Sequence, residues 1–284
     1  MNTSNKHGVK RTLSARLSQN AIRYKQNKIA EEKELSESEV NTKKKLKHAT
    51  NINDNNTALL ISNKLLNLFF DQSCISLAKS LLGKVLVRKL QSNEILRGRI
   101  VETECYLGTI DKASHSYKGK RTNRNEAMFL PPGTAYVYTI YGMYFCFNIS
   151  SHEEGSAVLI RALEPLQNTS VMQTFRSVKR KSSAVLKDKD LCNGPSKLCL
   201  AFNIDKQLNK VDLCTSNDLW LDDGTEIPCS DIIACKRIGI DSAGEEWANK
   251  PLRFYIKDCV YVSMRNKLAE NLHKTDTVQD LNIL

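Results

Sequence analysis

The chain has 284 residues and a formal net charge of +11, which comes from 42 Lys+Arg against 31 Asp+Glu. This length can bury the core of one large domain or of two small ones. No stretch approaches the roughly 18 apolar residues that a membrane-spanning helix needs, which argues against an integral membrane protein.

Cysteine and histidine usage narrows the class of protein further. The nine Cys are odd in number and scattered, and no two of them form Cys-x-x-Cys. The chain also lacks the apolar core of a signal peptide, so we expect free thiols in a reducing compartment. Five scattered His show no paired ligand spacing. We therefore expect no metal site and no other cofactor.

The N-terminal segment differs from the rest of the chain in composition. Residues 1–55 carry 12 Lys+Arg and 6 Asp+Glu, a net charge of +6, and only nine of these residues are Leu, Ile, Val or Phe. So polar a segment cannot bury enough apolar surface to fold, which predicts a disordered basic arm over residues 1–56. A solubilising tail is the simplest interpretation of this arm. The lysine run at residues 43–47 suits nuclear import or nucleic-acid binding, whereas the acid-free residues 1–30 suit a mitochondrial presequence. We expect a nuclear protein, with the mitochondrion as the alternative.

Residues 57–268 are predicted to form one α+β domain, followed by a tail over residues 269–284. A helix should run from an N-cap at Asp71 to Leu82 and stop at Gly83. Strands and helices then alternate in groups, which favours a mixed or antiparallel sheet. The expected strands cover residues 84–90, 96–106, 135–140, 144–150, 156–162, 232–238, 252–256 and 261–263, with helices near 170–179 and 195–202.

Two carboxylates and a tyrosine share one face of the strand over residues 96–106. Side chains alternate along a strand, so Glu102, Glu104 and Tyr106 point the same way. A solvated face is the ordinary interpretation of such a pair of acids. The strand is otherwise apolar, however, and a carboxylate beside an aromatic ring is what is expected where a flat base is held and a water is activated.

A predicted hairpin carries an apolar bend. Tyr141-Gly-Met143 separates two strands at a place where Asn, Asp or Ser would ordinarily be found. Such a turn is either buried under another element or protrudes as a wedge. In a basic protein, a protruding apolar wedge suits entry into the DNA minor groove and unstacking of a base step. Asn148 and Arg161 lie on strands expected to neighbour this hairpin.

Several motifs in collinear order resemble the alkyladenine (3-methyladenine) DNA glycosylase family. They include Val101-Glu-Thr-Glu-Cys-Tyr106, Ala113-Ser-His-Ser116, Tyr136-Val-Tyr138, Ile140-Tyr-Gly-Met-Tyr-Phe-Cys146, Asn148-Ile-Ser150, Gly194-Pro-Ser-Lys197 and Arg237-Ile-Gly-Ile-Asp-Ser-Ala-Gly244. The resemblance covers roughly residues 65–265. It implies one mixed domain around a curved antiparallel sheet, with a protruding hairpin that inserts into DNA.

The resemblance also implies a role for each matching residue. Glu104 corresponds to the carboxylate that activates the attacking water, and Arg161 to the arginine that positions that water. Tyr141 corresponds to the intercalating tyrosine, with Met143 beside it. The residues that bind the extruded base correspond to Tyr106, His115, Tyr138 and Asn148, and Asn148 is the one expected to disfavour the amine of normal guanine.

The implied reaction is the hydrolytic removal of damaged purines from double-stranded DNA, of the 3-methyladenine, 7-methylguanine, hypoxanthine and ethenoadenine class. With water as nucleophile, we expect a monofunctional, monomeric glycosylase that leaves an abasic site for downstream repair proteins. Phosphate contacts are expected from the basic residues Lys118, Lys120, Arg121, Arg124 and Lys197. Two alternatives stay open: a non-enzymatic architectural DNA binder, and a metal-dependent phosphodiesterase with Glu102 and Glu104 as ligands.

Overall fold

The computed structural model describes residues 63–178 and 184–273. The predicted basic arm over residues 1–56 lies outside these residues, and so does most of the predicted tail over residues 269–284. In the described part, no helix is long and apolar enough to cross a membrane.

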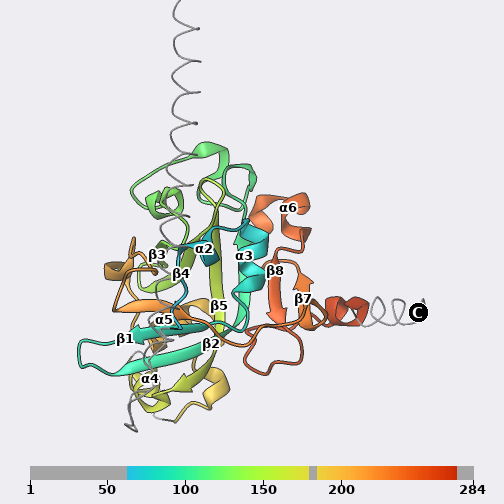
Figure 1. Ribbon diagram of the computed structural model, residues 1–284. Helices are drawn as coiled ribbons and strands as arrows, with labels where there is room; N and C mark the ends of the chain where they lie inside the picture. The colour runs from blue at the N-terminus through green and yellow to red at the C-terminus, as the bar shows by residue number, and fades with distance from the viewer. Residues whose placement is uncertain (1–62, 179–183, 274–284) are drawn as a thin grey trace, which may run out of the picture. The chain divides into compact units, whose positions relative to one another are not determined.

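One antiparallel sheet organises the described residues (Figure 1). Its strands are β1 (Val85–Lys89), β2 (Ile95–Tyr106), β3 (Ala135–Ile140), β4 (Tyr144–Ser150), β5 (Ala157–Gln167), β6 (Leu219–Asp222), β7 (Ile232–Cys235) and β8 (Arg253–Ile256). The order along the sheet is β3-β4-β5-β2-β1-β6, and β8 joins β2 with β7 outside it. The expectation of a mixed fold around an antiparallel sheet is confirmed.

Strand β2 pairs with three other strands, so the sheet branches at this strand. One of its edges pairs with β5 along most of its length, while the other pairs first with β1 and then, at residues 102–104, with β8. The pairing register between β2 and β5 shifts on both sides of Glu102. Such bulges bend a strand and increase its twist. This local bend curls the sheet and brings side chains from β2, β5 and β8 to one place.

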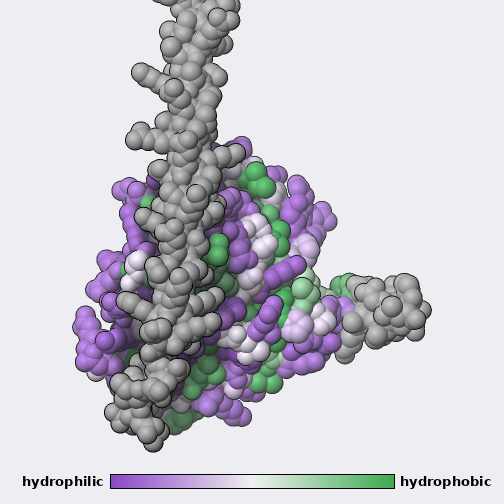
Figure 2. Space-filling view, in the orientation of Figure 1, coloured by the Kyte–Doolittle hydropathy of each residue, from purple (hydrophilic) through white to green (hydrophobic). Residues whose placement is uncertain are grey.

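Short helices cover the sheet. They are α2 (Asn67–Phe70), α3 (Cys74–Ser80), α4 (Thr169–Ser177), α5 (Pro195–Ala201) and α6 (Glu245–Asn249), and residues 267–273 are also helical. Single 3₁₀ turns occur at Gly108–Ile110, Tyr117–Gly119, Glu126–Phe129, Asp188–Asp190, Lys206–Leu208, Cys229–Asp231 and Asp241–Ala243. The main core lies between the sheet and helices α3 and α5, and includes Leu77, Phe147, Ile160, Leu198 and Phe202. On the face seen in Figure 2, hydrophilic residues dominate and hydrophobic ones form small separate patches.

The start of α3 corrects the prediction from the sequence. Its N-cap is Ser73, whose hydroxyl accepts a hydrogen bond from the Ser76 N–H, and not Asp71. Asp71 instead lies within 2.6 Å of His152 Nδ1. The carboxylate of Glu153 accepts the N–H of Cys74 at 2.8 Å, so two side chains satisfy free donors at this helix end.

Other elements differ from their predicted bounds for reasons of pairing. Strand β5 runs to Gln167 because β2 continues to supply partners there, whereas β7 stops at Cys235. Strand β6 was not predicted, because it has only four residues and is defined by its pairing with the distant β1 and by a single bridge to Lys64. Residues 261–263 do not form the expected strand.

Gly83 is required by the backbone after α3. Its φ is +87°, and a Cβ at this position would lie 2.0 Å from the carbonyl oxygen of Thr225. We therefore expect Gly83→Ala to lower the free energy of unfolding by at least about 2 kcal/mol, measured by urea denaturation. Gly119→Ala is the control: φ there is +74°, but nothing lies within 4 Å of the added Cβ. Strain alone should cost about 1 kcal/mol there; equal losses in both variants would exclude the clash as the cause.

Candidate active site

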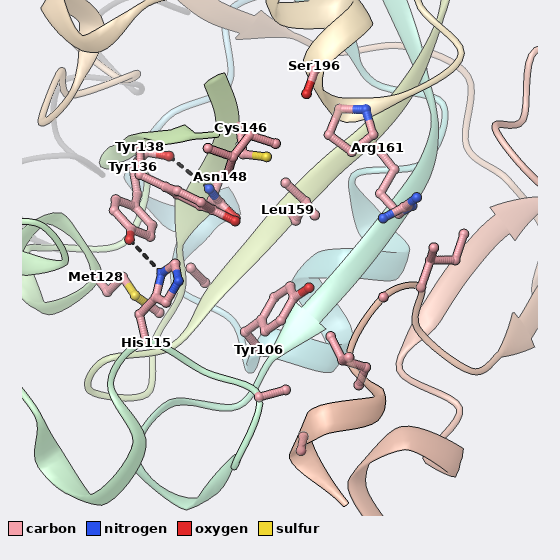
Figure 3. Close-up of a pocket in the computed structure, with 18 of the residues that line it drawn as sticks. Tyr106, His115, Met128, Tyr136, Tyr138, Cys146, Asn148, Leu159, Arg161 and Ser196 are labelled. Atoms are coloured by element: carbon pink, nitrogen blue, oxygen red, sulfur yellow. Dashed lines mark hydrogen bonds between the residues drawn. The ribbon is translucent and has the colours of Figure 1, made fainter. Parts of the chain in front are cut away.

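A cavity of about 560 Å³ opens beside the curled part of the sheet (Figure 3). Its lining comes from the end of β2 and the loop after it, from Met128, from strands β3 to β5, from the start of α5 and from the loop after β7. Lining residues include Tyr106, His115, Tyr136, Tyr138, Tyr141, Cys146, Asn148, Arg161 and Ile238. The volume is within the range of pockets that bind small organic groups.

Aromatic rings form opposite sides of this cavity (Figure 3). On one side, Tyr136 and Tyr138 stack with centroids 5.2 Å apart, and the His115 ring meets Tyr138 edge-on at 4.8 Å. His115 Nδ1 is also 2.8 Å from the Tyr136 hydroxyl. Tyr106 lies on the other side of the cavity. Flat apolar faces across a cavity of this size suit a planar ring as ligand.

Glu104 is fully buried next to the cavity. Its Oε2 accepts hydrogen bonds from the Tyr106 hydroxyl at 3.1 Å and lies 3.2 Å from Arg161 Nη1. The N–H of Ile238 donates to Oε1 at 2.8 Å. Tyr106, Arg161 and Ile238 all line the cavity, so each of the groups holding Glu104 also faces the space where a ligand fits.

Burial raises the pKa of the Glu104 carboxyl above its ordinary value, and the charge of Glu102 acts in the same direction. Arg161, the Ile238 N–H and the Tyr106 hydroxyl oppose this by stabilising the ionised form. The result is a carboxylate more basic than one in water, with an adjacent cation that favours its charged state. Such a group suits proton abstraction.

Arg161 on β5 bridges the two glutamates of β2. Its Nε donates to Glu102 Oε1 at 3.0 Å, while Nη1 contacts Glu104. Glu102 also accepts from Arg253 Nη1 at 2.8 Å and from the Ser263 N–H at 2.7 Å. The alternation along β2 predicted that Glu102, Glu104 and Tyr106 share a face, and these contacts confirm it.

Asn148 lies opposite Tyr136 in the β3–β4 ladder, and its side chain is buried at the cavity wall. Its Nδ2 donates to the Tyr136 carbonyl oxygen at 3.0 Å. This bond fixes the orientation of the amide, so the polar group that a ligand meets there is set in advance.

The turn between β3 and β4 is exposed. Tyr141 and Met143 have 88% and 54% of their surface accessible, which excludes a turn buried under another described element. Tyr141 has φ +50° and Gly142 has φ +70°, with a hydrogen bond from the Met143 N–H to the Ile140 carbonyl. A large residue in the left-handed region is uncommon and marks a constrained conformation. Tyr141 also lines the rim of the cavity.

The predicted phosphate contacts are exposed near the cavity. The guanidinium of Arg124 lies 5.3 Å from the Tyr138 ring and that of Arg121 lies 5.0 Å from Phe129. Lys118, Lys120 and Lys197 are also exposed; Lys197 donates to Asn193 Oδ1 at 2.8 Å. The two arginines thus combine surface charge with contacts to aromatic rings.

A match to a family model and to curated proteins decides the family. A model described as methylpurine-DNA glycosylase matches residues 68–260. The human DNA-3-methyladenine glycosylase is 52% identical over 205 residues, 71% of this chain and 68% of that protein. A probable DNA-3-methyladenine glycosylase of Encephalitozoon cuniculi is 47% identical over 209 residues, 73% of this chain and 97% of the other.

The chain belongs to the methylpurine-DNA glycosylase family. The resemblance inferred from its motifs is therefore confirmed, and with it the class of enzyme, a DNA glycosylase that hydrolyses N-glycosyl bonds. Coverage of the relatives is uneven: the chain spans 62% of the length of the mouse DNA-3-methyladenine glycosylase, at 50% identity.

Several residues of this glycosylase site were not predicted from the sequence. Arg237 forms a buried pair with Asp111, with contacts of 2.5 and 3.0 Å, and its guanidinium lies 4.8 Å from the Tyr106 ring. Ile238 supplies the N–H to Glu104. Both belong to a motif that carried the family resemblance but had no assigned role. Ser263 lies beyond the matched residues 68–260, and no sequence signal pointed to it.

Metal ligation is the alternative that required further acidic or histidine ligands. In residues 63–178 and 184–273, no group of three or more His, Cys, Asp or Glu side chains is placed to hold a metal ion. Glu102 and Glu104 are instead held by arginines and backbone N–H groups.

His115 should be neutral at physiological pH. Desolvation, followed by the nearby cations Arg124 and Lys120, lowers its pKa from 6.5 to about 4. We expect an NMR titration to place its midpoint near 4, and Arg124→Gln to raise that midpoint because one cation is removed. His152 is an internal reference: its hydrogen bond to Asp71 raises its pKa above 6.5. A midpoint near 6.5 for His115 would show that its pKa is not lowered.

Proposed function

We propose that this glycosylase initiates base-excision repair by flipping a damaged purine out of duplex DNA and hydrolysing its N-glycosidic bond with a water activated by Glu104. One observation carries the proposal: Glu104 is bound to the cavity-lining residues Tyr106 and Arg161, beside a cavity with aromatic walls and an exposed tyrosine at its rim. The substrates proposed are 3-methyladenine, 7-methylguanine, hypoxanthine and ethenoadenine.

The flipped base would stack between Tyr106 on one side and His115 and Tyr138 on the other. Stacking tolerates many substituents, which suits a set of chemically different purines. A cationic alkylated purine gains a further attraction to the ring faces. Asn148, with its amide fixed by Tyr136, is proposed to disfavour the exocyclic amine of normal guanine.

Tyr141 would fill the space that the flipped nucleotide leaves, and Met143 would support it from the same turn. Both are exposed, and Tyr141 lies in the turn between β3 and β4 with a positive φ. Unstacking a nucleotide costs a few kcal/mol, so a side chain that replaces the lost stacking lowers the free energy of the flipped state.

Hydrolysis follows from the charges around Glu104. As the glycosidic bond breaks, positive charge develops on the sugar, and a nearby carboxylate stabilises it while taking a proton from water. Arg161 is proposed to position that water. Alkylation at N3 or N7 makes the purine a good leaving group, whereas neutral hypoxanthine needs ring protonation. Because the proposed base is a carboxylate and the nucleophile is water, we propose no strand-cleaving step.

We propose that the partner is double-stranded DNA, bound by a monomer through Lys120, Arg121, Arg124 and Lys197, with Lys118 in the same loop. We further propose that the basic arm directs the protein to the nucleus, or alternatively to the mitochondrion, and that downstream repair proteins receive the abasic site. The architectural-binder alternative does not account for a basic carboxylate beside the cavity.

Glu104→Gln tests the catalytic role directly. The substitution keeps the shape of the side chain but removes the proton acceptor, so single-turnover release of 7-methylguanine from duplex DNA should fall by about 10²- to 10⁴-fold. Affinity for a duplex with an abasic-site analogue should change little. The assay contains EDTA: no base release, with strand cleavage only when a divalent metal is added, would favour the phosphodiesterase alternative, and release that survives Glu104→Gln would refute the assigned role.

Tyr141→Ser tests the wedge. We expect release of ethenoadenine from duplex DNA to fall by about 5- to 100-fold, since one stacking interaction worth about 1–3 kcal/mol is lost. The same lesion in single-stranded DNA is the matched control substrate, because no base pair has to be opened. There the variant should retain the wild-type rate. Equal rates for variant and wild type on the duplex would show that this turn does not support flipping.

A further inference from the structure

Glu102 is a fully buried carboxylate with no role in the reaction described above. Its Oε1 accepts hydrogen bonds from Arg161 Nε at 3.0 Å, Arg253 Nη1 at 2.8 Å and the Ser263 hydroxyl at 2.9 Å. Its Oε2 accepts the Ser263 N–H at 2.7 Å. Three of these four donors converge on Oε1, and all four hold the side chain in place.

The geometry of Arg161 depends on this carboxylate. An arginine beside one isolated carboxylate favours a bidentate pair, in which two parallel N–H groups occupy both oxygens. Here Nε is held by Glu102, and Nη2 lies 3.4 Å from the Ser263 hydroxyl. Only Nη1 reaches Glu104, at 3.2 Å. Glu104 therefore keeps acceptor positions that a bidentate arginine would occupy.

We propose that Glu102, held by Ser263, is a positioning residue that keeps Arg161 in a single contact with Glu104 and so leaves the catalytic carboxylate free to accept a proton from water. This inference rests on the proposed function of Glu104. Ser263 contributes from a segment beyond the family match at residues 68–260. Under this proposal, the segment that contains Ser263 helps to position the side chains around the catalytic carboxylate.

Removing the charge of Glu102 should also change how the rate of base release depends on pH. Several titratable or charged groups interact electrostatically with Glu104 or pair with it in the sheet: Glu102, Cys105 and Tyr106 on β2, Cys146 on β4, Arg161 on β5, Cys235 on β7, Arg237 after β7, and Arg253, its ladder partner on β8. Glu102 raises the pKa of Glu104, and it also shares the charge of Arg161. Without it, the pKa of Glu104 falls.

The sign of the effect is defined because the base must be ionised. Activity rises with pH through the pKa of Glu104, so a lower pKa moves the acid limb of the rate profile to lower pH. We expect Glu102→Gln to shift this limb measurably to lower pH. We also expect the plateau rate to fall by about 10- to 100-fold, because Arg161 is released to form a bidentate pair and Glu104 becomes a weaker base.

The experiment measures single-turnover release of 7-methylguanine by the full chain as a function of pH, because this leaving group needs no protonation. Rates are divided by the fraction of molecules that bind an abasic-site analogue, so loss of folded protein does not enter. Glu164→Gln is the matched control: Glu164 pairs with Arg99 at 2.5 Å across the same two strands, outside the cavity. Its rate and acid limb should equal those of the wild type.

Ser263→Ala keeps the proposal falsifiable if Glu102→Gln does not fold. This half-buried residue loses only its hydroxyl, so the plateau rate should fall several-fold with unchanged affinity for the abasic-site analogue, and Ser263→Thr should restore it.

A wild-type rate and acid limb in Glu102→Gln, or a wild-type rate in Ser263→Ala, would overturn the proposal. A rate loss with an unmoved limb would show a structural role alone. If Glu104→Gln is inactive while Glu102→Gln is normal, this inference fails and the proposed function stands; an active Glu104→Gln refutes the function itself.

Discussion

The structure depends on two glutamates and two arginines being buried together. Taking each ion out of water costs several kcal/mol, so the group is stable only if every charge has partners in good geometry. Glu102 and Glu104 come from β2, Arg161 from β5 and Arg253 from β8. No single hairpin can supply all four charges. The branched pairing of β2, with a bulge on each side of Glu102, brings them together, and the curled sheet is thus the arrangement that the ion cluster requires.

The two glutamates have opposite environments although they are only two residues apart. Glu102 accepts four hydrogen bonds, from Arg161, Arg253 and twice from Ser263. Glu104 has three partners, Tyr106, Arg161 and Ile238, and each of them lines the cavity. Desolvation makes Glu104 more basic, and Arg161 prevents this from neutralising it outright. A pair of carboxylates separated in this way can divide two tasks, one structural and one chemical, which is a common means of running acid–base chemistry near neutral pH.

The sequence predicted what depends on local periodicity and chain order. Alternation placed Glu102, Glu104 and Tyr106 on one face, and the strands that contain Tyr138 and Asn148 were found with their bounds. It did not predict what depends on distant pairing. Arg237 and Ile238 reach β2 across more than 130 residues, and Ser263 across more than 150, because β7 and β8 carry them there. The N-cap of α3 was assigned to Asp71 because Asp and Ser have similar preference for that position.

The aromatic side chains of both cavity walls are in contact with other side chains of the protein before any DNA binds. The Tyr106 ring contacts the guanidinium of Arg237, itself fixed by Asp111, and the Tyr138 ring contacts both Tyr136 and Arg124. Walls that are already ordered lose little entropy when a base enters. Two stacking faces worth about 1–3 kcal/mol each are then comparable with the few kcal/mol needed to flip a nucleotide. In the proposed reaction, a damaged base that is already weakly paired would fall on the favourable side of this balance, and an intact pair would not. Under the proposed function, ordered walls lower the cost of admitting any base, so discrimination between lesions and intact bases would come from the strength of base pairing and from Asn148.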